Sequence, residues 1–279
     1  MKKIILFVSA VLISLGIQAQ VETPQPSPFS KIEQVVGLTD VSVEYSRPSM
    51  KGRTIYGNLV PYDKLWRTGA NKNTQITFSD DVKVGGSELK KGAYAIFTKP
   101  GKESWEVIFY SDTENWGTPR NWDDSKVAAK VNVKSTKIPM NVETFTIMFS
   151  DFTMNSALIN ILWENTEVAL KLEVPTKKKA MASIEKVMAG PSPNDHYQAA
   201  VFYKDVEEYA KAKEHIEKAV AGRADAFWYH RQHSLILAKT GDKEGAIKAA
   251  KTSLKLAEEA KNADYVKLNK DSLAEWGAK

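Results

Sequence analysis

Between residues 32 and 174 the chain alternates apolar and polar side chains with a period of two. The clearest runs are 41–46, 76–79, 105–110, 144–149 and 168–174. Alternation of this kind is typical of strands that bury one face. Turn sequences separate the runs at Gly85-Gly86, Lys91-Gly92, Pro100-Gly101 and Glu164-Asn165. About eight to ten short strands at such spacing predict an antiparallel β-sandwich or barrel.

Beyond residue 175 the spacing of apolar positions changes to three and four, which predicts helices. A first helix is expected over about 177–189 and a last one over about 264–276, with Ser192 or Asn194 capping the second helix. One helical face recurs 34 residues later: Tyr209, Ala212, Ile216 and Ala219 become Lys243, Ala246, Ala250 and Ser253. His196, Ala200 and Tyr203 likewise become His230, Ser234 and Leu237.

A helix–turn–helix period of 34 residues resembles a tetratricopeptide repeat, and Gly241-Asp242 provides the turn of the second copy. Such arrays usually bind peptides or proteins on a concave face. The alternative is a helical cap that only stabilises the chain, because a fold does not fix a function. The sequence therefore predicts an α-helical repeat domain, with a protein partner as one of its two interpretations.

The first residues have the layout of a secretory signal peptide. Lys2 and Lys3 precede an apolar run from Ile4 to Ile17, and Ala19 offers a small residue for cleavage. The run is shorter than the about 20 apolar residues that span a bilayer. We expect a periplasmic or secreted protein without stable membrane insertion after leader cleavage. The predicted organisation is a signal peptide (1–20), a linker (21–30), a β domain (31–175) and a helical domain (176–279).

Composition removes many kinds of chemistry. The net charge of +5 falls to +3 without the two leader lysines, so nothing predicts a nucleic-acid partner. Cysteine is absent, and all four histidines follow residue 195. A Ser-His-Asp triad and histidine- or cysteine-ligated zinc are thereby excluded from the β domain. We predict no cofactor and no metal site. His196 and His230 are repeat equivalents and are interpreted as structural, while the spacing of His230 and His233 is the one metal-like feature.

The candidate site lies in segment 46–74, a connection of about 28 residues that is far longer than a hairpin needs. It contains three arginines, three lysines, one aspartate and no glutamate. Arginine presents a planar fork that matches carboxylate or phosphate groups. The candidate ligand-binding residues of this segment are Arg47, Lys51, Arg53, Tyr56, Trp66, Arg67 and Asn71. Alternatively, Trp66 fills the core and Arg67 pairs with Asp63 or Asp40.

Several motifs of this region occur in the order of a known family. They run from Ser46 through Trp66-Arg67-Thr68-Gly69-Ala70-Asn71, with Gly92-Ala93-Tyr94 and Trp116-Gly117 downstream. Residues 30–175 resemble the secreted bacterial family catalogued as domain of unknown function 2911. The resemblance implies a β-rich secreted domain and supplies no catalytic residue. The matching motif residues are Arg47, Lys51, Gly52, Arg53, Gly57, Pro61, Trp66, Arg67, Gly69, Asn71 and Thr74.

A second cluster combines two tryptophans with amides and carboxylates: Asn115-Trp116-Gly117 and Arg120-Asn121-Trp122-Asp123-Asp124. Trp116 and Trp122 are candidate ligand-binding residues, because an indole ring can stack on a sugar. The same composition also suits a tightly folded loop. Asp123-Asp124 is weak support for calcium, which takes six to eight oxygen ligands.

Three functions follow from these observations. The first is a secreted binding module with an arginine-lined pocket for a small anion, a glycan or a peptide. The second is a hydrolase using carboxylate or arginine chemistry, and the third is a cell-envelope scaffold; catalytic residues stay unidentified. Arginines around one pocket would favour binding, and two carboxylates about 5–10 Å apart in it would favour glycoside hydrolysis. Arginines held in separate buried ion pairs would argue against both binding and hydrolysis and would favour the scaffold function.

Overall fold

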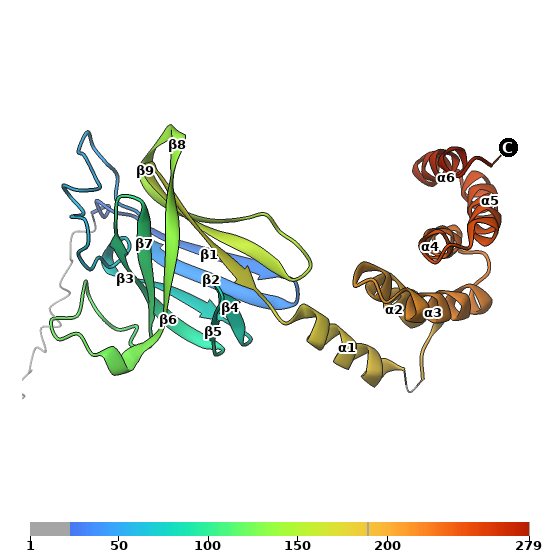
Figure 1. Cartoon of the computed structure of the whole chain (residues 1–279), viewed down its shortest axis with the longest axis horizontal. Helices are drawn as coiled ribbons and strands as arrows, with labels where there is room; N and C mark the ends of the chain where they lie inside the picture. Colours follow the sequence, from blue (N-terminus) through green and yellow to red (C-terminus); the bar gives the residue numbers. More distant parts are fainter. Residues whose placement is uncertain (1–22, 189, 279) are drawn as a thin grey trace, which may run out of the picture.

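A computed structural model describes residues 23–188 and 190–278, and its nine strands precede its six α-helices (Figure 1). The predicted signal peptide (1–20) lies outside the described residues. The strands are β1 (Phe29–Val36), β2 (Thr39–Ser46), β3 (Ala70–Phe78), β4 (Val82–Val84), β5 (Ser87–Leu89), β6 (Gly92–Pro100), β7 (Ser104–Tyr110), β8 (Val127–Ser150) and β9 (Ser156–Glu173). The helices are α1 (Thr176–Val187), α2 (Pro193–Asp205), α3 (Tyr209–Gly222), α4 (Phe227–Lys239), α5 (Lys243–Glu259) and α6 (Ala263–Glu275).

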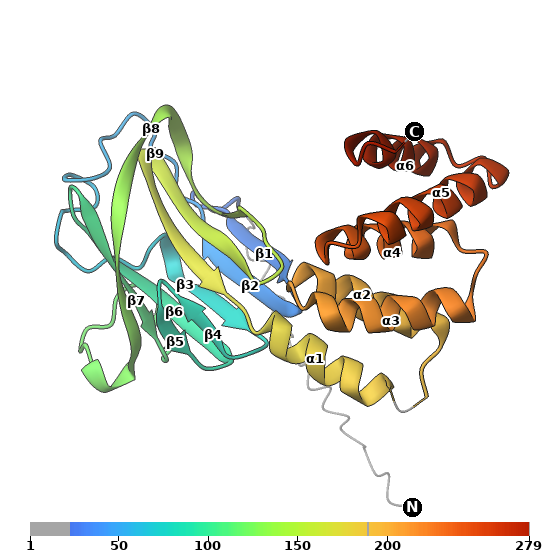
Figure 2. The ribbon, with the colours of Figure 1, turned by 45° about the vertical axis from the view of Figure 1, so that its right-hand side comes forward.

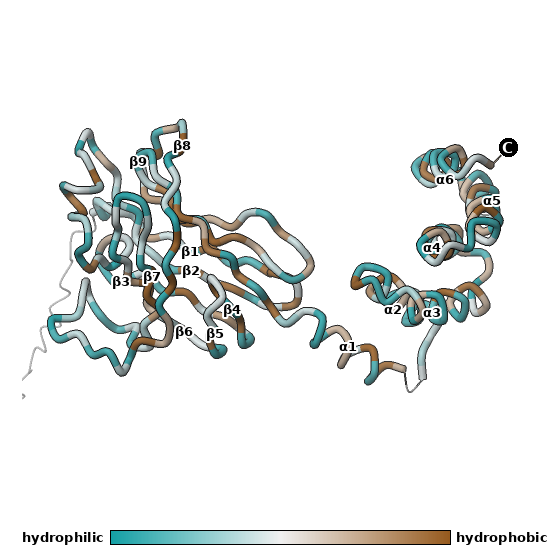
Figure 3. Tube along the Cα trace, viewed as in Figure 1, coloured by the Kyte–Doolittle hydropathy of each residue, from teal (hydrophilic) through white to brown (hydrophobic). Residues whose placement is uncertain are grey.

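All strand pairs are antiparallel, in the order β1-β2-β3-β6-β7-β8-β9-β4-β5. β8 pairs with β7 through its first part and with β9 through its second part. The sheet folds over at this long strand, and polar and apolar residues alternate along its strands (Figure 3). The backbone NH of Phe145 donates to the Pro48 carbonyl at 2.9 Å, which ties the segment after β2 to β8. The predicted antiparallel β class and the number of strands are confirmed.

One of the predicted turns is wrong. Glu164-Asn165 lies inside β9, whose pairing with β8 shifts register near this point. Glu164 takes a positive φ of 54°, so the chain makes a local irregularity and then continues as a strand. A polar pair with turn propensity therefore marks a bulge here and not the end of a strand.

Large side chains fill the inside of the folded sheet. Trp105, Trp163, Phe78, Phe145 and Ile76 are each at most 1% exposed and belong to one cluster. They come from β3, β7, β8 and β9, so both halves of the sheet contribute to the same core. The alternation of the sequence is thus the alternation of core and surface.

The helical part repeats its elements at the predicted spacing. α2 and α4 begin at residues 193 and 227 and end at 205 and 239, and α3 and α5 begin at 209 and 243. Figure 2 shows the α2–α3 pair, the α4–α5 pair and α6 stacked in succession. Ser192 caps α2 in a capping box with Asp195, as one of the two predicted caps, and Asp242 caps α5. The repeat of helix pairs is confirmed, while its assignment as tetratricopeptide stays a prediction.

Helix α1 joins the two parts (Figures 1 and 2). Lys179 of α1 forms an ion pair with Asp80 at 2.7 Å, and Lys177 pairs with Glu208 at 2.8 Å before α3. The Lys179 ammonium also donates to the Leu38 carbonyl. None of the helices in residues 23–188 and 190–278 combines the length and apolar character needed to cross a membrane.

Candidate functional site

The segment 47–69 covers one end of the folded sheet and borders a cavity of about 380 Å³. Its lining comes from the chain before β1, from this segment and from β3 and β9. The lining residues are Pro26, Ser27, Pro48, Ser49, Lys51, Arg53, Leu59, Val60, Trp66, Arg67, Gly69, Ala70 and Trp163. Of the predicted site residues, the cavity brings together Lys51, Arg53, Trp66 and Arg67.

Aromatic rings form the apolar wall of this cavity. Trp66 is half-buried and stacks on Trp163, with ring centroids 5.9 Å apart and planes 19° apart. Its ring also meets Trp105 and Phe145 edge-on, at 6.4 and 5.4 Å. The Trp66 indole NH donates to the Gly69 carbonyl at 3.1 Å, which fixes the ring. Trp66 is therefore at once part of the core boundary and a lining residue, which combines the two interpretations of its role.

Arg67 differs from the other two arginines of the segment. Its Nε is buried without a hydrogen-bond partner, and its guanidinium takes part in no ion pair among the described residues. The alternative pairing with Asp63 or Asp40 is wrong. The Nη1 atom of Arg67 lies close to Gly117: a Cβ atom added to this glycine would be 3.6 Å from it. The guanidinium thus reaches from the cavity towards the 115–117 loop with its charge uncompensated.

The other two arginines bind the backbone. Arg53 donates from Nε to the Met50 carbonyl at 2.8 Å and from Nη2 to the Ser49 carbonyl at 2.6 Å. Arg47 lies outside the cavity lining and donates to the Phe145 carbonyl at 3.0 Å and to the Thr146 hydroxyl at 2.8 Å. Arg47 therefore holds the segment against β8, while Arg53 closes a turn at the cavity rim.

Two further candidates of this segment have structural contacts. Asn71 donates from its side-chain amide to the Ser27 carbonyl and to the Ser46 hydroxyl, each at 3.2 Å. Tyr56 is 8% exposed, and its ring lies 5.0 Å from that of Trp105. Burial raises the pKa of the Tyr56 hydroxyl, so this group stays protonated at physiological pH. Neither side chain lines the cavity.

The second predicted cluster splits into an exposed ring and a pinned loop. Trp116 is 78% exposed and bridges through its backbone to Lys72. Trp122 stacks on Tyr110 at 4.5 Å and donates from its indole NH to the Asp124 carboxylate at 3.1 Å. Asp123 accepts from the Ser125 hydroxyl and NH, which lower the pKa of its carboxyl. The interpretation as a tightly folded loop therefore fits Trp122, whereas the Trp116 ring is exposed to solvent.

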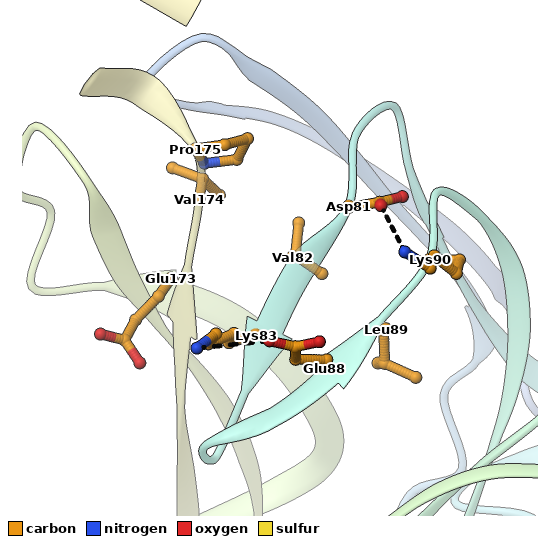
Figure 4. A pocket seen from close by; sticks show the side chains of 9 residues that line it. All are labelled: Asp81, Val82, Lys83, Glu88, Leu89, Lys90, Glu173, Val174 and Pro175. Atoms are coloured by element: carbon orange, nitrogen blue, oxygen red, sulfur yellow. Dashed lines mark hydrogen bonds and ion pairs between the residues drawn. The ribbon is translucent and has the colours of Figure 1, made fainter. Parts of the chain in front are cut away.

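A second cavity, of about 330 Å³, lies between the β4–β5 hairpin and the end of β9. Figure 4 shows two ion pairs among its side chains: Lys90 reaches Asp81 at 2.9 Å and Lys83 reaches Glu88 at 3.5 Å. Glu173 of the same lining pairs with Lys171 at 3.3 Å. The backbone NH of Lys91 and the ion pair with Lys90 lower the pKa of Asp81. The first cavity contrasts with it, because its described lining holds three cations and no carboxylate.

Several lining residues escaped the sequence analysis. Trp163 lies on β9 and Pro26-Ser27 lies in the predicted linker, both far from segment 46–74 in the chain. Trp163 lies in an ordinary strand pattern, and no local signal connects it to Trp66. Only the folding of the sheet onto itself brings these residues together.

Comparison with known families gives one match. Residues 27–172 match the model of a family described as a protein of unknown function (DUF2911). The matched region covers the strands up to the last residue but one of β9 and the whole segment 46–74, and it ends before the helices. No curated protein matches the chain. Because the match spans more than half of its residues, the chain belongs to the DUF2911 family of proteins of unknown function.

Proposed function

We propose that this protein is a secreted binding protein whose cavity at segment 47–69 holds the anionic group of a small ligand or peptide. The observation that carries the proposal is the Arg67 guanidinium, which borders a cavity without a counter-ion. A charged group that loses water without a partner is costly, so an anion that supplies hydrogen bonds is favoured. Carboxylate and phosphate groups match the guanidinium fork.

The rest of the lining supports an anion with an apolar body. Lys51 and Arg53 add positive charge on one side of the cavity, and the stacked rings of Trp66 and Trp163 offer an apolar wall. A cavity of this size with a few convergent polar groups is typical of small-molecule sites. Its described lining has no pair of carboxylates, which glycoside hydrolysis requires, so binding is favoured over the hydrolase alternative.

The proposal is tested by thermal shift and calorimetry in a buffer free of phosphate and carboxylate. Organic acids, sugar phosphates, uronic acids and peptides are compared with their neutral amides, esters or parent sugars. A ligand that binds only the folded state raises the melting temperature. We expect anionic compounds of at least one class to raise it and their neutral counterparts to leave it unchanged.

Variants of the cavity make the test specific. Arg67→Ala is expected to abolish the shift with a modest loss of stability, because the side chain makes no hydrogen bond to other described residues. Lys51→Gln removes a second cation and serves if Arg67→Ala does not fold. Lys90→Gln, in the cavity whose charges are paired, is the matched control and keeps the shift. No shift with any anion, or the same shift in Arg67→Ala and Lys51→Gln, contradicts the proposal.

A further inference from the structure

Two histidines of the helical part meet across the first helix pair, with their rings tilted by 40°. His196 at the start of α2 and His215 in α3 place their Nδ1 atoms 3.0 Å apart. Their ring centroids are 5.2 Å apart, and both residues are partly exposed. The Tyr203 ring stacks on His215 with centroids 5.5 Å apart, so this imidazole contacts two rings.

The pair is not a by-product of the repeat. The positions 34 residues further along are His230 and Ala249. His230 instead directs Nε2 at the Ala224 carbonyl at 2.9 Å, and Ala249 packs into the interface of the second helix pair. The second pair of helices therefore forms without two facing imidazoles. The first pair carries a polar arrangement that its packing does not require.

The surroundings favour the neutral form of both rings. Burial and Lys218 lower the pKa of His196, and burial and the neighbouring His196 lower the pKa of His215. The carboxylates of Asp195 and Glu214 act in the opposite direction. A neutral imidazole has one nitrogen with a free lone pair, which is the form that binds metal ions.

We propose that His196 and His215 bind one divalent transition-metal ion through the Nδ1 atoms of both rings. In the metal-free pair one Nδ1 carries a hydrogen that the other accepts. On binding, that hydrogen is exchanged through solvent to Nε2 of the same ring. Each imidazole thereby stays neutral and presents a lone pair to the ion.

The separation of the two nitrogens selects among metals. Bonds of about 2.0–2.1 Å to nitrogens 3.0 Å apart meet at about 91–97°, whereas tetrahedral zinc needs about 109°. Angles near 90° suit adjacent positions of tetragonal copper(II) or nickel(II), and copper(II) binds nitrogen ligands most tightly of the first-row divalent ions. In the described residues no cluster of three or more histidines or carboxylates forms, so water completes the coordination.

The test is a copper(II) titration of the tag-free full chain at pH 7.5, followed by electron paramagnetic resonance and calorimetry. We expect one bound ion with hyperfine coupling to two imidazole nitrogens and a raised melting temperature. Nickel(II) is expected to bind more weakly than copper(II). At equal concentration, zinc(II) is expected to raise the melting temperature less than copper(II) does. Lowering the pH to 5 should release the copper, because protons compete for both rings.

Three variants decide the assignment. His196→Asn and His215→Gln are each expected to weaken copper binding at least about tenfold and to remove the two-nitrogen spectrum. His230→Asn, at the equivalent position of the second helix pair, is the matched control and keeps it. Circular dichroism verifies that each variant is folded. If one of His196→Asn and His215→Gln does not fold, the other one alone decides the test. An unchanged spectrum in the folded pair variants, equal loss in His230→Asn, or no copper uptake by the natural protein overturns the proposal.

Discussion

The strands and the helices of this protein fill their interiors in different ways. The largest fully buried side chains of the sheet are Trp105, Trp163 and Tyr110. In the helical part, alanines such as Ala212 and Ala250 are completely buried. Facing sheets lie about 10 Å apart, so large side chains must fill the space between them. Helix axes lie about 8–10 Å apart, and small residues at the contact allow the shorter of these distances. The sheet is therefore sensitive to lost volume, and the helices are sensitive to added volume.

The two parts also differ in the chemistry they leave unpaired. The strands contain no histidine and leave an arginine beside a cavity, and the helices bring two imidazoles together. Few side-chain bonds join the parts, chiefly those of Lys179 to Asp80 and to the Leu38 carbonyl. Each part should therefore respond to its own substitutions, and the following changes test that independence.

The largest effect is expected from Trp163→Ala in the sheet. Trp163 is 1% exposed, stacks on Trp66 and donates to the Glu143 carbonyl at 3.1 Å. Its loss should cost about 3–5 kcal/mol of unfolding free energy. Denaturant unfolding followed by tryptophan fluorescence and circular dichroism should show the sheet transition lowered and the helical transition unchanged. Trp116→Ala, which removes a 78% exposed ring, is the control with little effect. If both transitions move together, the parts are one cooperative unit.

The second effect adds volume to the helices. Ala250 of α5 is fully buried, and Ala250→Leu should cost about 1–3 kcal/mol because the helix contact has no room for the larger side chain. The helical transition should fall while the sheet transition stays in place. Lys248→Leu places the same side chain on the exposed face of α5 and should change stability little. Equal destabilisation by both variants would show that packing against α5 is not the cause.

The third effect concerns the start of the helical array. Ser192 accepts from the Asp195 NH at 3.3 Å, and the Asp195 carboxylate accepts from the Ser192 NH at 2.8 Å. Ser192→Ala removes the cap and should lower the stability of the helical part by about 1 kcal/mol. Ser192→Asp preserves an acceptor and should restore most of it. Thermal unfolding followed at 222 nm measures both, and equal stability of the alanine and aspartate variants would contradict a capping role.

The smallest effect is a pH dependence confined to the helices. Burial lowers the pKa values of His196, His215 and His233 below the usual value of 6.5. The unfolded chain then binds more protons than the folded one, so their contribution is complete above about pH 6.5 and is lost below it. Because His196 and His215 keep part of their water, the change should be smaller than that of the cap variant.

Metal-free protein should therefore show a helical transition that falls between pH 7.5 and 5 and a sheet transition that stays constant. The strands hold no histidine, and the pKa values of Asp80, Asp81, Asp112 and Asp123 are shifted down from an ordinary value already below 4. A sheet transition that moves equally in this window would contradict the assignment to the histidines.

Local patterns predicted the antiparallel strands of the first part and the helices of the second. The repeat at 34 residues predicted the helix pairs because it reflects how each helix meets its neighbour. The turn predicted at Glu164-Asn165 failed because pairing with β8 holds β9 together on both sides of a single residue with positive φ. Tertiary pairing there outweighs the local turn preference.

The sites were less predictable because they depend on distant contacts. Composition alone could not distinguish Arg67 from Arg47, since β8 supplies the carbonyl and hydroxyl that occupy Arg47. The sequence analysis missed the contact between His196 and His215. The 34-residue repeat relates His196 to His230, but it does not show which side chain of α3 contacts α2. The sequence thus predicted which types of residue could form a site, but it did not predict which side chains contact one another.

The order of the strands also has a consequence in time. The short β4–β5 hairpin is made early, yet β4 pairs with β9, joining Lys83 to Glu173 some 90 residues later. The sheet cannot be completed until the last strand has left the ribosome, and contacts so distant in sequence form slowly. The β4–β5 hairpin therefore stays without its partner strand until β9 is made, and the described helices are made after the sheet is able to close.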